Sequence, residues 1–184
     1  MNLFIYTCIA VFAAIFIETL MLYSQYKKNK MTEYFGDKDF KVHALITSFL
    51  WFFMFLLFFL LQFEEHPSFH NIEIFRLAGA VLLVIGLIIC VWAFLLMGIK
   101  RSLAVNFYRS NIPLQKSGIY KYLKNPETAG LCCALIGFAF FTSSLYNVII
   151  AFEFIILMIP HTIIENKPLR NTDPGFEKLS SCSK

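Results

Sequence analysis

Residues 44–63, ALITSFLWFFMFLLFFLLQF, form a run of twenty residues without a single charge. A transmembrane helix needs about 20 mostly apolar residues, because lipid offers no hydrogen bonds to its backbone. Comparable runs occur at about 3–24, 72–99, 127–143 and 146–165. A hydrophobic fraction of 58% and a mean hydropathy of +0.66 exclude an ordinary soluble domain. We therefore predict an all-α, polytopic membrane protein with about five transmembrane helices, the last two forming a helical hairpin.

The basic residues fall on one side of this five-helix arrangement. Of the 16 Lys and Arg residues, all except Arg76 lie in the first loop, the third loop or the tail at 166–184. By the positive-inside rule this side is cytoplasmic, which places the N-terminus outside and the C-terminus inside. We predict a single integral-membrane domain, residues 1–184, in a bacterial inner membrane or the endoplasmic reticulum.

The net charge of +4 is explained by this orientation, and no basic-aromatic module predicts nucleic-acid binding. The five cysteines show no zinc-ligand spacing, so no metal site is expected. Four of them lie within the predicted helices, where packing is their expected role.

One polar, turn-prone stretch interrupts the apolar pattern. Residues 118–130, GIYKYLKNPETAG, carry two lysines, two glycines and a proline directly before the fourth apolar run. Pro126 suits the first turn of a helix, and Asn125 suits its N-cap. Lysine and tyrosine at a membrane interface are also ordinary anchors. The stretch is expected to lie at the cytoplasmic surface.

Ionisable residues within apolar runs are the first candidates for function. His161 and Glu165 are four residues apart, and so share one face at the cytoplasmic end of the last helix. Capping and membrane anchoring is the simpler interpretation of that pair. Glu18 is interpreted as an interfacial glutamate bonded to a neighbouring helix, and Glu153 as a structural hydrogen-bonding residue.

The order of these motifs resembles the C-terminal half of the integral-membrane methyltransferases. These are the isoprenylcysteine carboxyl methyltransferases and the phosphatidylethanolamine and phospholipid methyltransferases. Their pattern is G-x-Y-x-x-x-R-H-P-x-Y-x-G, then a helical hairpin, then two acidic residues and a tail. Gly118, Tyr120, Pro126 and Gly130 match the pattern, and Glu165 matches the first acidic position. The resemblance covers about the last 70 residues.

The chain departs from the pattern at several positions. Lys124 stands where the family has arginine, and Asn125 where it often has histidine. Thr128 replaces the second tyrosine, and Asn166 replaces the second acidic residue. Residues 173–179, DPGFEKL, are a weak echo of the family's tail.

The resemblance implies S-adenosylmethionine as the methyl donor, bound in a cytoplasmic pocket between the hairpin and the tail. The acceptor would be a membrane lipid or a lipidated substrate, either a lipid amine or an isoprenylated cysteine carboxylate. His161 and Glu165 are the catalytic candidates, with His161 taking a proton from an amine acceptor. The residues expected to bind the donor are Gly118, Tyr120, Tyr122, Lys124, Asn125, Pro126, Gly130 and Glu165.

Two alternatives to an active methyltransferase stay open. A chain of the same fold that lost catalysis would serve as a lipid-binding or assembly subunit, with Asn125 and Asn166 marking the loss. A relative of the membrane sterol reductases, which share a similar hairpin, would use NADPH. Binding of S-adenosylmethionine, of NADPH or of neither separates the three, because a bound ligand raises the thermal midpoint.

Overall fold

The computed structural model describes residues 2–65, 67–69, 73–98, 107–108 and 117–172, and the regular elements in this part are all helices. They are α1 (Asn2–Lys28), α2 (Lys30–Phe35), η1 (Gly36–Lys38), α3 (Asp39–Leu61), α4 (Glu73–Met97), η3 (Gly118–Lys121), α6 (Pro126–Thr142) and α7 (Leu145–Thr172). The weak tail motif at 173–179 lies outside the described residues.

Four helical segments are long and apolar enough to cross a membrane: Asn2–Lys28, Lys30–Leu61, Glu73–Met97 and Leu145–Asn166. The fifth, α6, has 17 residues, which is the lower limit for crossing the hydrocarbon core. The prediction of an all-α polytopic membrane protein is confirmed. Among the described apolar helices of this membrane protein, α6 is thus the shortest.

Three of the helices, α1, α3 and α7, extend beyond the apolar runs that predicted them. α1 continues to Lys28 rather than to about residue 24, and α3 begins at Asp39 rather than at about 44. α7 continues to Thr172, seven residues past the predicted end at 165. Hydropathy marks only the part of a helix that faces lipid. Polar segments such as SQYKK are good helix formers, and so prolong the helix into the interface.

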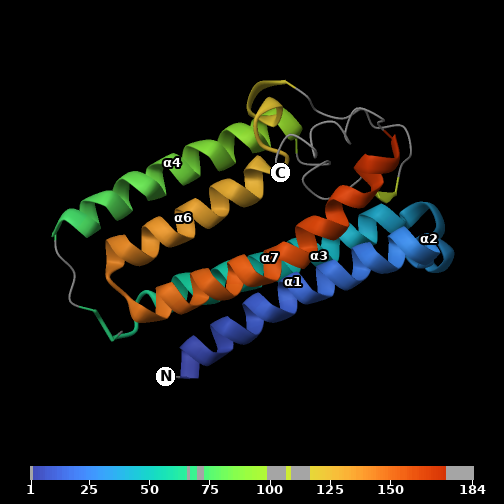
Figure 1. The fold of residues 1–184 in the computed structure, drawn as a ribbon. Coiled ribbons are helices and arrows are strands. Elements are labelled where there is room, and N and C mark those ends of the chain that lie inside the picture. Colours follow the sequence, from blue (N-terminus) through green and yellow to red (C-terminus); the bar gives the residue numbers. More distant parts are fainter. Residues whose placement is uncertain (1, 66, 70–72, 99–106, 109–116, 173–184) are drawn as a thin grey trace.

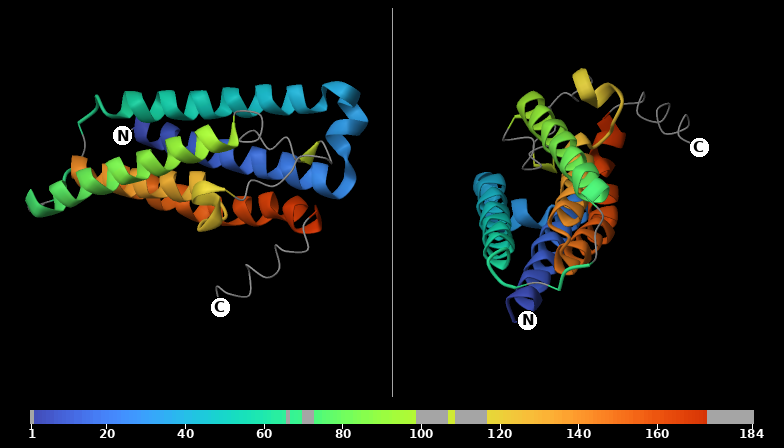
Figure 2. Two further views of the ribbon diagram at one scale, coloured as in Figure 1. Left: turned by 90° about the horizontal axis from the view of Figure 1, so that it is seen from above. Right: turned by 90° about the vertical axis from the view of Figure 1, so that its left-hand side faces the viewer.

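The five long helices are ordered in space as α4, α6, α7, α1 and α3, each in contact with the next (Figures 1 and 2). α4 and α6 make one closely packed pair. α7 contacts α6 on one side and α1 on the other. We call the end of the bundle that carries the start of α6 and the last turns of α7 the inner end, and the end that carries the α6–α7 turn the outer end. Residues of α7 at the inner end can therefore reach both halves of the protein.

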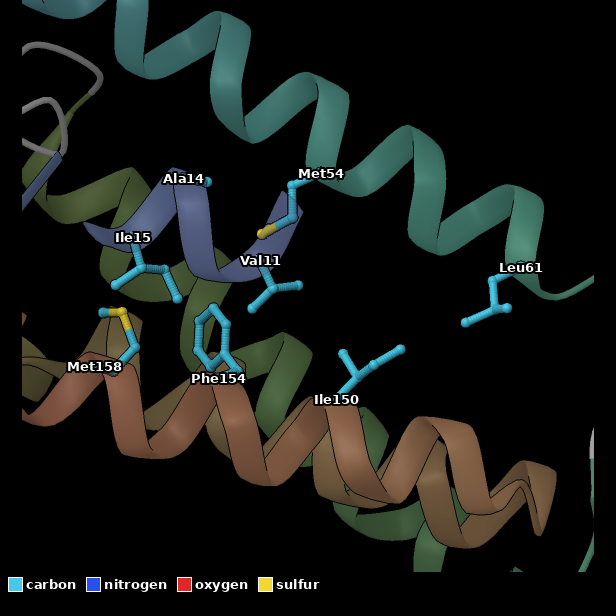
Figure 3. Packing of buried hydrophobic residues seen from close by; sticks show 8 residues of the cluster. All are labelled: Val11, Ala14, Ile15, Met54, Leu61, Ile150, Phe154 and Met158. Atoms are coloured by element: carbon cyan, nitrogen blue, oxygen red, sulfur yellow. The ribbon is translucent and has the colours of Figure 1, made fainter. Parts of the chain in front are cut away.

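The apolar core lies where α1, α3 and α7 meet (Figure 3). Val11 and Ile15 of α1 face Phe154 and Met158 of α7, and Met54 of α3 closes the cluster. Each of these side chains is at most 6% exposed. The large apolar residues on the outer helix faces are exposed instead, as expected for surfaces that face lipid.

The outer end of the bundle is fixed by hydrogen bonds between its two loops. The Leu145 amide donates to the Pro67 carbonyl at 3.0 Å, and the Phe69 amide donates to the Ser143 carbonyl at 3.1 Å. Gln62 at the end of α3 and Asn147 in α7 exchange amide hydrogen bonds of 3.0 and 3.3 Å. These contacts fix the α6–α7 hairpin to the end of α3.

Glycines bring the backbones of α4 and α6 together. Gly79 and Gly86 of α4 lie against Gly137 and Gly130 of α6, and each pair is spaced by seven residues. A Cβ added to Gly86 would lie 2.7 Å from the Gly130 carbonyl oxygen, and even closer to the Ala134 amide. Membrane helices gain no hydrophobic energy by leaving lipid, so close backbone packing of small residues is what holds such a pair.

We expect Gly86→Leu to lower the thermal midpoint of the purified protein strongly. By intrinsic propensity alone, replacing a helical glycine should stabilise the helix by roughly 0.8–1 kcal/mol. A loss of stability therefore reports the lost backbone contact with α6.

The matched control is Ala78→Leu, because Ala78 is exposed on the same helix. Thermal unfolding in detergent compares the two variants. A midpoint for Gly86→Leu at or above that of the control would contradict the packing role of this glycine.

Candidate functional site

The inner ends of α6 and α7 are joined by a side-chain hydrogen bond. Nδ2 of Asn125 donates to Oε2 of Glu165 at 3.2 Å. Asn125 occupies the N-cap position of α6, as predicted, with Pro126 in the first turn, but its side chain makes no cap hydrogen bond. The asparagine thus reaches across the hairpin to the carboxylate instead of capping its own helix.

Asn166, the residue that follows Glu165 on α7, has an unmet acceptor. The Oδ1 atom of Asn166 is buried, and no hydrogen-bond donor within the described residues reaches it. A buried oxygen without a donor costs free energy unless a ligand or water supplies one. Asn166 replaces the family's second acidic residue, and it keeps an acceptor oxygen at the position following Glu165.

The short helix η3 packs against the inner end of α4. Gly118 begins η3 with a φ of +62°, and an added Cβ would lie 2.6 Å from the Leu96 side chain. The Tyr120 hydroxyl donates to the Ala93 carbonyl at 3.3 Å. These contacts fix the start of the polar stretch at 118–130, which we call the lip, against α4.

The other residues expected to bind the donor differ in their surroundings. Tyr122 is 80% exposed, with the Lys121 ammonium 5.8 Å from its ring centre. Lys124 is exposed as well. Pro126 and Gly130 are buried, and Gly130 lies against Gly86 of α4. The close packing of α6 against α4 therefore explains why this position is a glycine.

His161 faces α1. Its Nδ1 lies 3.1 Å from the Thr19 hydroxyl, and the side chain is only 6% exposed. The Thr19 hydroxyl donates its single proton to the Ile15 carbonyl at 2.6 Å. Thr19 therefore accepts a hydrogen bond from Nδ1–H of His161. This assigns the neutral imidazole to the Nδ1–H tautomer, with the lone pair on Nε2.

Further polar groups lie between α1 and α3, where the sequence predicted little chemistry. The Trp51 indole donates to Oε2 of Glu18 at 2.8 Å, and Glu18 is 5% exposed. This agrees with the prediction that Glu18 bonds to a neighbouring helix. His43 is fully buried, with Nε2 3.5 Å from the Thr47 hydroxyl. Its Nδ1 has no hydrogen-bond partner within the described part of the chain.

A chain of hydrogen bonds joins the end of α1, the short helix α2 and the start of α3. Gln25 donates to the Thr32 hydroxyl at 2.8 Å, which donates to Oδ2 of Asp39 at 2.7 Å. The ring of Tyr108 lies 5.2 Å from that of His43. Burial, then the charges of Asp39 and Glu18, raise the pKa of the Tyr108 phenol.

The polar groups of α3 and α7 lie at a similar level along the bundle. The rings of Trp51 and Phe154 are 6.1 Å apart, and His43 and His161 lie eight and seven residues from them towards the same end. The inner end of α7 thus connects a site on the α6 side, at Asn125 and Glu165, with a site on the α1 side, at Glu18, His43 and His161. Sequence analysis identified only the α7 residues as a pair.

We expect Asn125→Asp to destabilise the protein. The change places a second carboxylate beside Glu165 in a poorly solvated position, where like charges repel. Losing a hydrogen bond to a charged group costs about 1.5–3 kcal/mol, which corresponds to several degrees in thermal midpoint at this chain length.

The control is Asn2→Asp at the exposed start of α1, where a negative charge is favourable. An unchanged midpoint for Asn125→Asp would mean that the Asn125–Glu165 contact contributes nothing to stability.

The comparisons with known proteins agree with this architecture. The model of the phospholipid methyltransferase family matches residues 74–172, which is more than half of the chain. The match runs from the start of α4 to the end of α7 and so includes η3, further towards the N-terminus than the motifs indicated. Neither a curated protein nor a solved structure gives a significant match. The chain belongs to the phospholipid methyltransferase family.

Proposed function

We propose that the protein transfers a methyl group from S-adenosylmethionine to the amine of a membrane lipid. The observations that carry this proposal are the Asn125–Glu165 contact and the buried Oδ1 of Asn166, the next residue along α7, which no donor within the described residues reaches. The Asn125–Glu165 contact joins the polar lip to the last helix at the point where the family motifs meet. Family membership supports methyl transfer as the reaction class.

The polar groups at the inner end of α6 and α7 fit the donor. The Glu165 carboxylate and the Asn166 oxygen are acceptors for its amino group. Lys124 and the first amides of α6 are donors for its carboxylate, because a helix N-terminus favours anions. Exposed Tyr122 offers an aromatic face for adenine or for the sulfonium. The remaining candidates, Gly118, Tyr120, Pro126 and Gly130, would shape the lip rather than contact the donor directly.

When bound, the donor supplies an electrophilic methyl group on a positively charged sulfur. The protein's own contribution is to hold the amine in line with that methyl group and to exclude water. An amine must first lose a proton to expose its lone pair. His161 would accept this proton on Nε2, since Thr19 occupies Nδ1.

The His161 geometry favours a lipid amine over an isoprenylated cysteine carboxylate. A carboxylate acceptor already carries a lone pair and needs no base. A buried imidazole whose tautomer is set by a hydroxyl on another helix suits proton removal. Methyl transfer to a carboxylate is therefore kept as an outcome of the experiment below.

The proposed orientation has the N-terminus of α1 outside and the inner end of α7 in the cytoplasm. The basic loop after α1 and the end of α7 lie at the same end of the bundle, opposite the N-terminus (Figure 1). By the positive-inside rule that end is cytoplasmic. The soluble donor would then reach Glu165 from the cytosol, in a bacterial inner membrane or the endoplasmic reticulum.

We expect Glu165→Ala to weaken S-adenosylmethionine binding about tenfold or more. A charge-assisted hydrogen bond contributes roughly 1.5–3 kcal/mol, and 1.4 kcal/mol corresponds to a factor of ten in affinity. Isothermal titration of the purified protein measures the change. Glu64→Ala, at the outer end of the bundle, is the control and should bind the donor like the wild type.

NADPH is titrated in parallel. If the wild-type protein binds NADPH and not S-adenosylmethionine, the reductase alternative replaces the present proposal. If it binds neither, the interpretation as a non-catalytic subunit replaces the present proposal.

We expect His161→Gln to slow methyl transfer to a lipid amine at least tenfold, while donor binding stays within about twofold of wild type. Glutamine keeps a hydrogen bond to Thr19 but takes up no proton near pH 7. The measurement is transfer of radiolabelled methyl from S-adenosylmethionine into phosphatidylethanolamine and into prenylated cysteine. Wild-type label found only in the prenylated cysteine would show that the acceptor is a carboxylate.

A further inference from the structure

We propose that Glu18, His43 and His161 form the head-group site of the acceptor, and that the hydrocarbon chain of the same lipid lies in an apolar cavity between α3 and α4. This inference rests on the proposed methyl transfer and assigns its acceptor side. Two of the three residues lie on α1 and α3, outside the part of the chain that matches the family.

The head-group site offers buried acceptors that the protein itself leaves open. Glu18 is 5% exposed and accepts from Trp51 on Oε2, and a carboxylate has capacity for further donors. Nδ1 of fully buried His43 lacks a partner within the described residues. Burying such groups without hydrogen bonds costs free energy. A ligand that brings N–H donors would recover this cost.

The charge of the site selects a cation. A primary ammonium carries three N–H donors and one positive charge, which suits a carboxylate and a neutral imidazole. Trp51 beside Glu18 and Tyr108 beside His43 add aromatic rings, which attract cations. A carboxylate head group would instead be repelled by Glu18 and by nearby Asp39, whose charges both act on Tyr108. The site therefore favours an amine.

The head-group site lies beside the proposed donor site without overlapping it. His161 is one helical turn before Glu165 on α7, and α7 contacts α1 on one side and α6 on the other. The ammonium would give one proton to an imidazole and become a neutral amine. Its lone pair then forms the N–C bond as the C–S bond breaks, and the electron pair of that bond stays on sulfur. The products are a methylammonium and a neutral thioether.

The helix faces that carry the head-group site continue outward into apolar surface. Val11 precedes Glu18 by seven residues on α1, and Phe154 precedes His161 by seven on α7. Seven residues are two turns, so the apolar level lies about 10 Å from the polar level. Val11 and Phe154 both line a cavity of about 180 Å³ whose lining is entirely apolar.

The cavity lies between helices, where a lipid chain could reach it from the membrane. α3 contributes Met54, Phe55 and Phe58 to its wall, and α4 contributes Leu83 and Leu87. The turn between cavity and head-group site is filled by Ile15 and Met158. Methionine is unbranched and repacks readily, so its movement would join the two parts into one amphipathic site.

The probe for this site is hexadecylamine, compared with hexadecanoate of the same chain length. Purified full-length protein in maltoside detergent is titrated with each, and binding is followed by the rise in thermal midpoint. We expect wild type to bind the amine at least tenfold more tightly than the carboxylate. Glu18→Gln keeps the shape and the Trp51 contact, and should lose most of this preference. Glu33→Gln, at an exposed position of α2, should keep it.

The proposal that the hydrocarbon chain of the lipid lies in the cavity is tested by filling the cavity from its lipid-exposed side. Leu87→Trp should weaken hexadecylamine binding about tenfold. Ile88→Trp, exposed on the same helix but outside the cavity lining, should not. Equal weakening by both variants, or by neither, would overturn the assignment of the cavity.

Equal binding of amine and carboxylate by wild type, or an unchanged preference in Glu18→Gln, would overturn the head-group site. If the protein binds S-adenosylmethionine but shows no amine preference, only the present inference fails. If it shows the amine preference but binds no donor, the proposed methyl transfer fails, and the amine site stands as a lipid site of a non-catalytic protein.

Discussion

The backbone contact between α4 and α6 is the constraint on which the inner end of the protein depends. In lipid, an apolar helix of 17 residues gains nothing from burying apolar surface, so α6 must be held by close packing. The paired glycines provide this contact, since neither backbone leaves room for a Cβ at these points. Once α6 is fixed along α4, its N-cap lies beside the last turns of α7. The Asn125–Glu165 hydrogen bond is possible only at that depth.

Much of the fold follows from the sequence, because the apolar runs and the basic loops constrain it. Hydropathy identified the long helices but not their polar ends, and α1, α3 and α7 all extend into the interface. The N-cap position of Asn125 was predictable from the following proline, since these signals are local. The partner of its side chain was not, because Glu165 lies 40 residues away. The glycine spacing was visible in both helices, and only its pairing across α4 and α6 required the structure.

The candidate site likewise has features that the sequence predicts and features that only the structure reveals. His161 and Glu165 are recognisable as a pair because helical periodicity relates them. The Thr19 hydroxyl that sets the His161 tautomer is 142 residues away, so no local pattern indicates it. His43 follows Lys41 at the start of an apolar run and has the sequence context of an interfacial residue. Its complete burial results from the packing of α1 and α3, which neither segment reveals alone.

The proposed methyl transfer assigns different roles to the two halves of the protein. If all acceptors of a family meet the same donor, the groups that hold the donor are expected in the segment that the family shares, α4 to α7. Acceptors differ in charge and in chain, and the helices outside that segment are where a chain can adapt to them. In the proposed site, Glu18 of α1 and His43 of α3 would supply a carboxylate and an imidazole for the acceptor. Because α7 contacts both α1 and α6, the acceptor amine would give its proton to His161 and take the methyl group from a donor held at Glu165, one turn further along the same helix. Such an arrangement ties reactivity to the simultaneous presence of both molecules, since neither half alone completes the site.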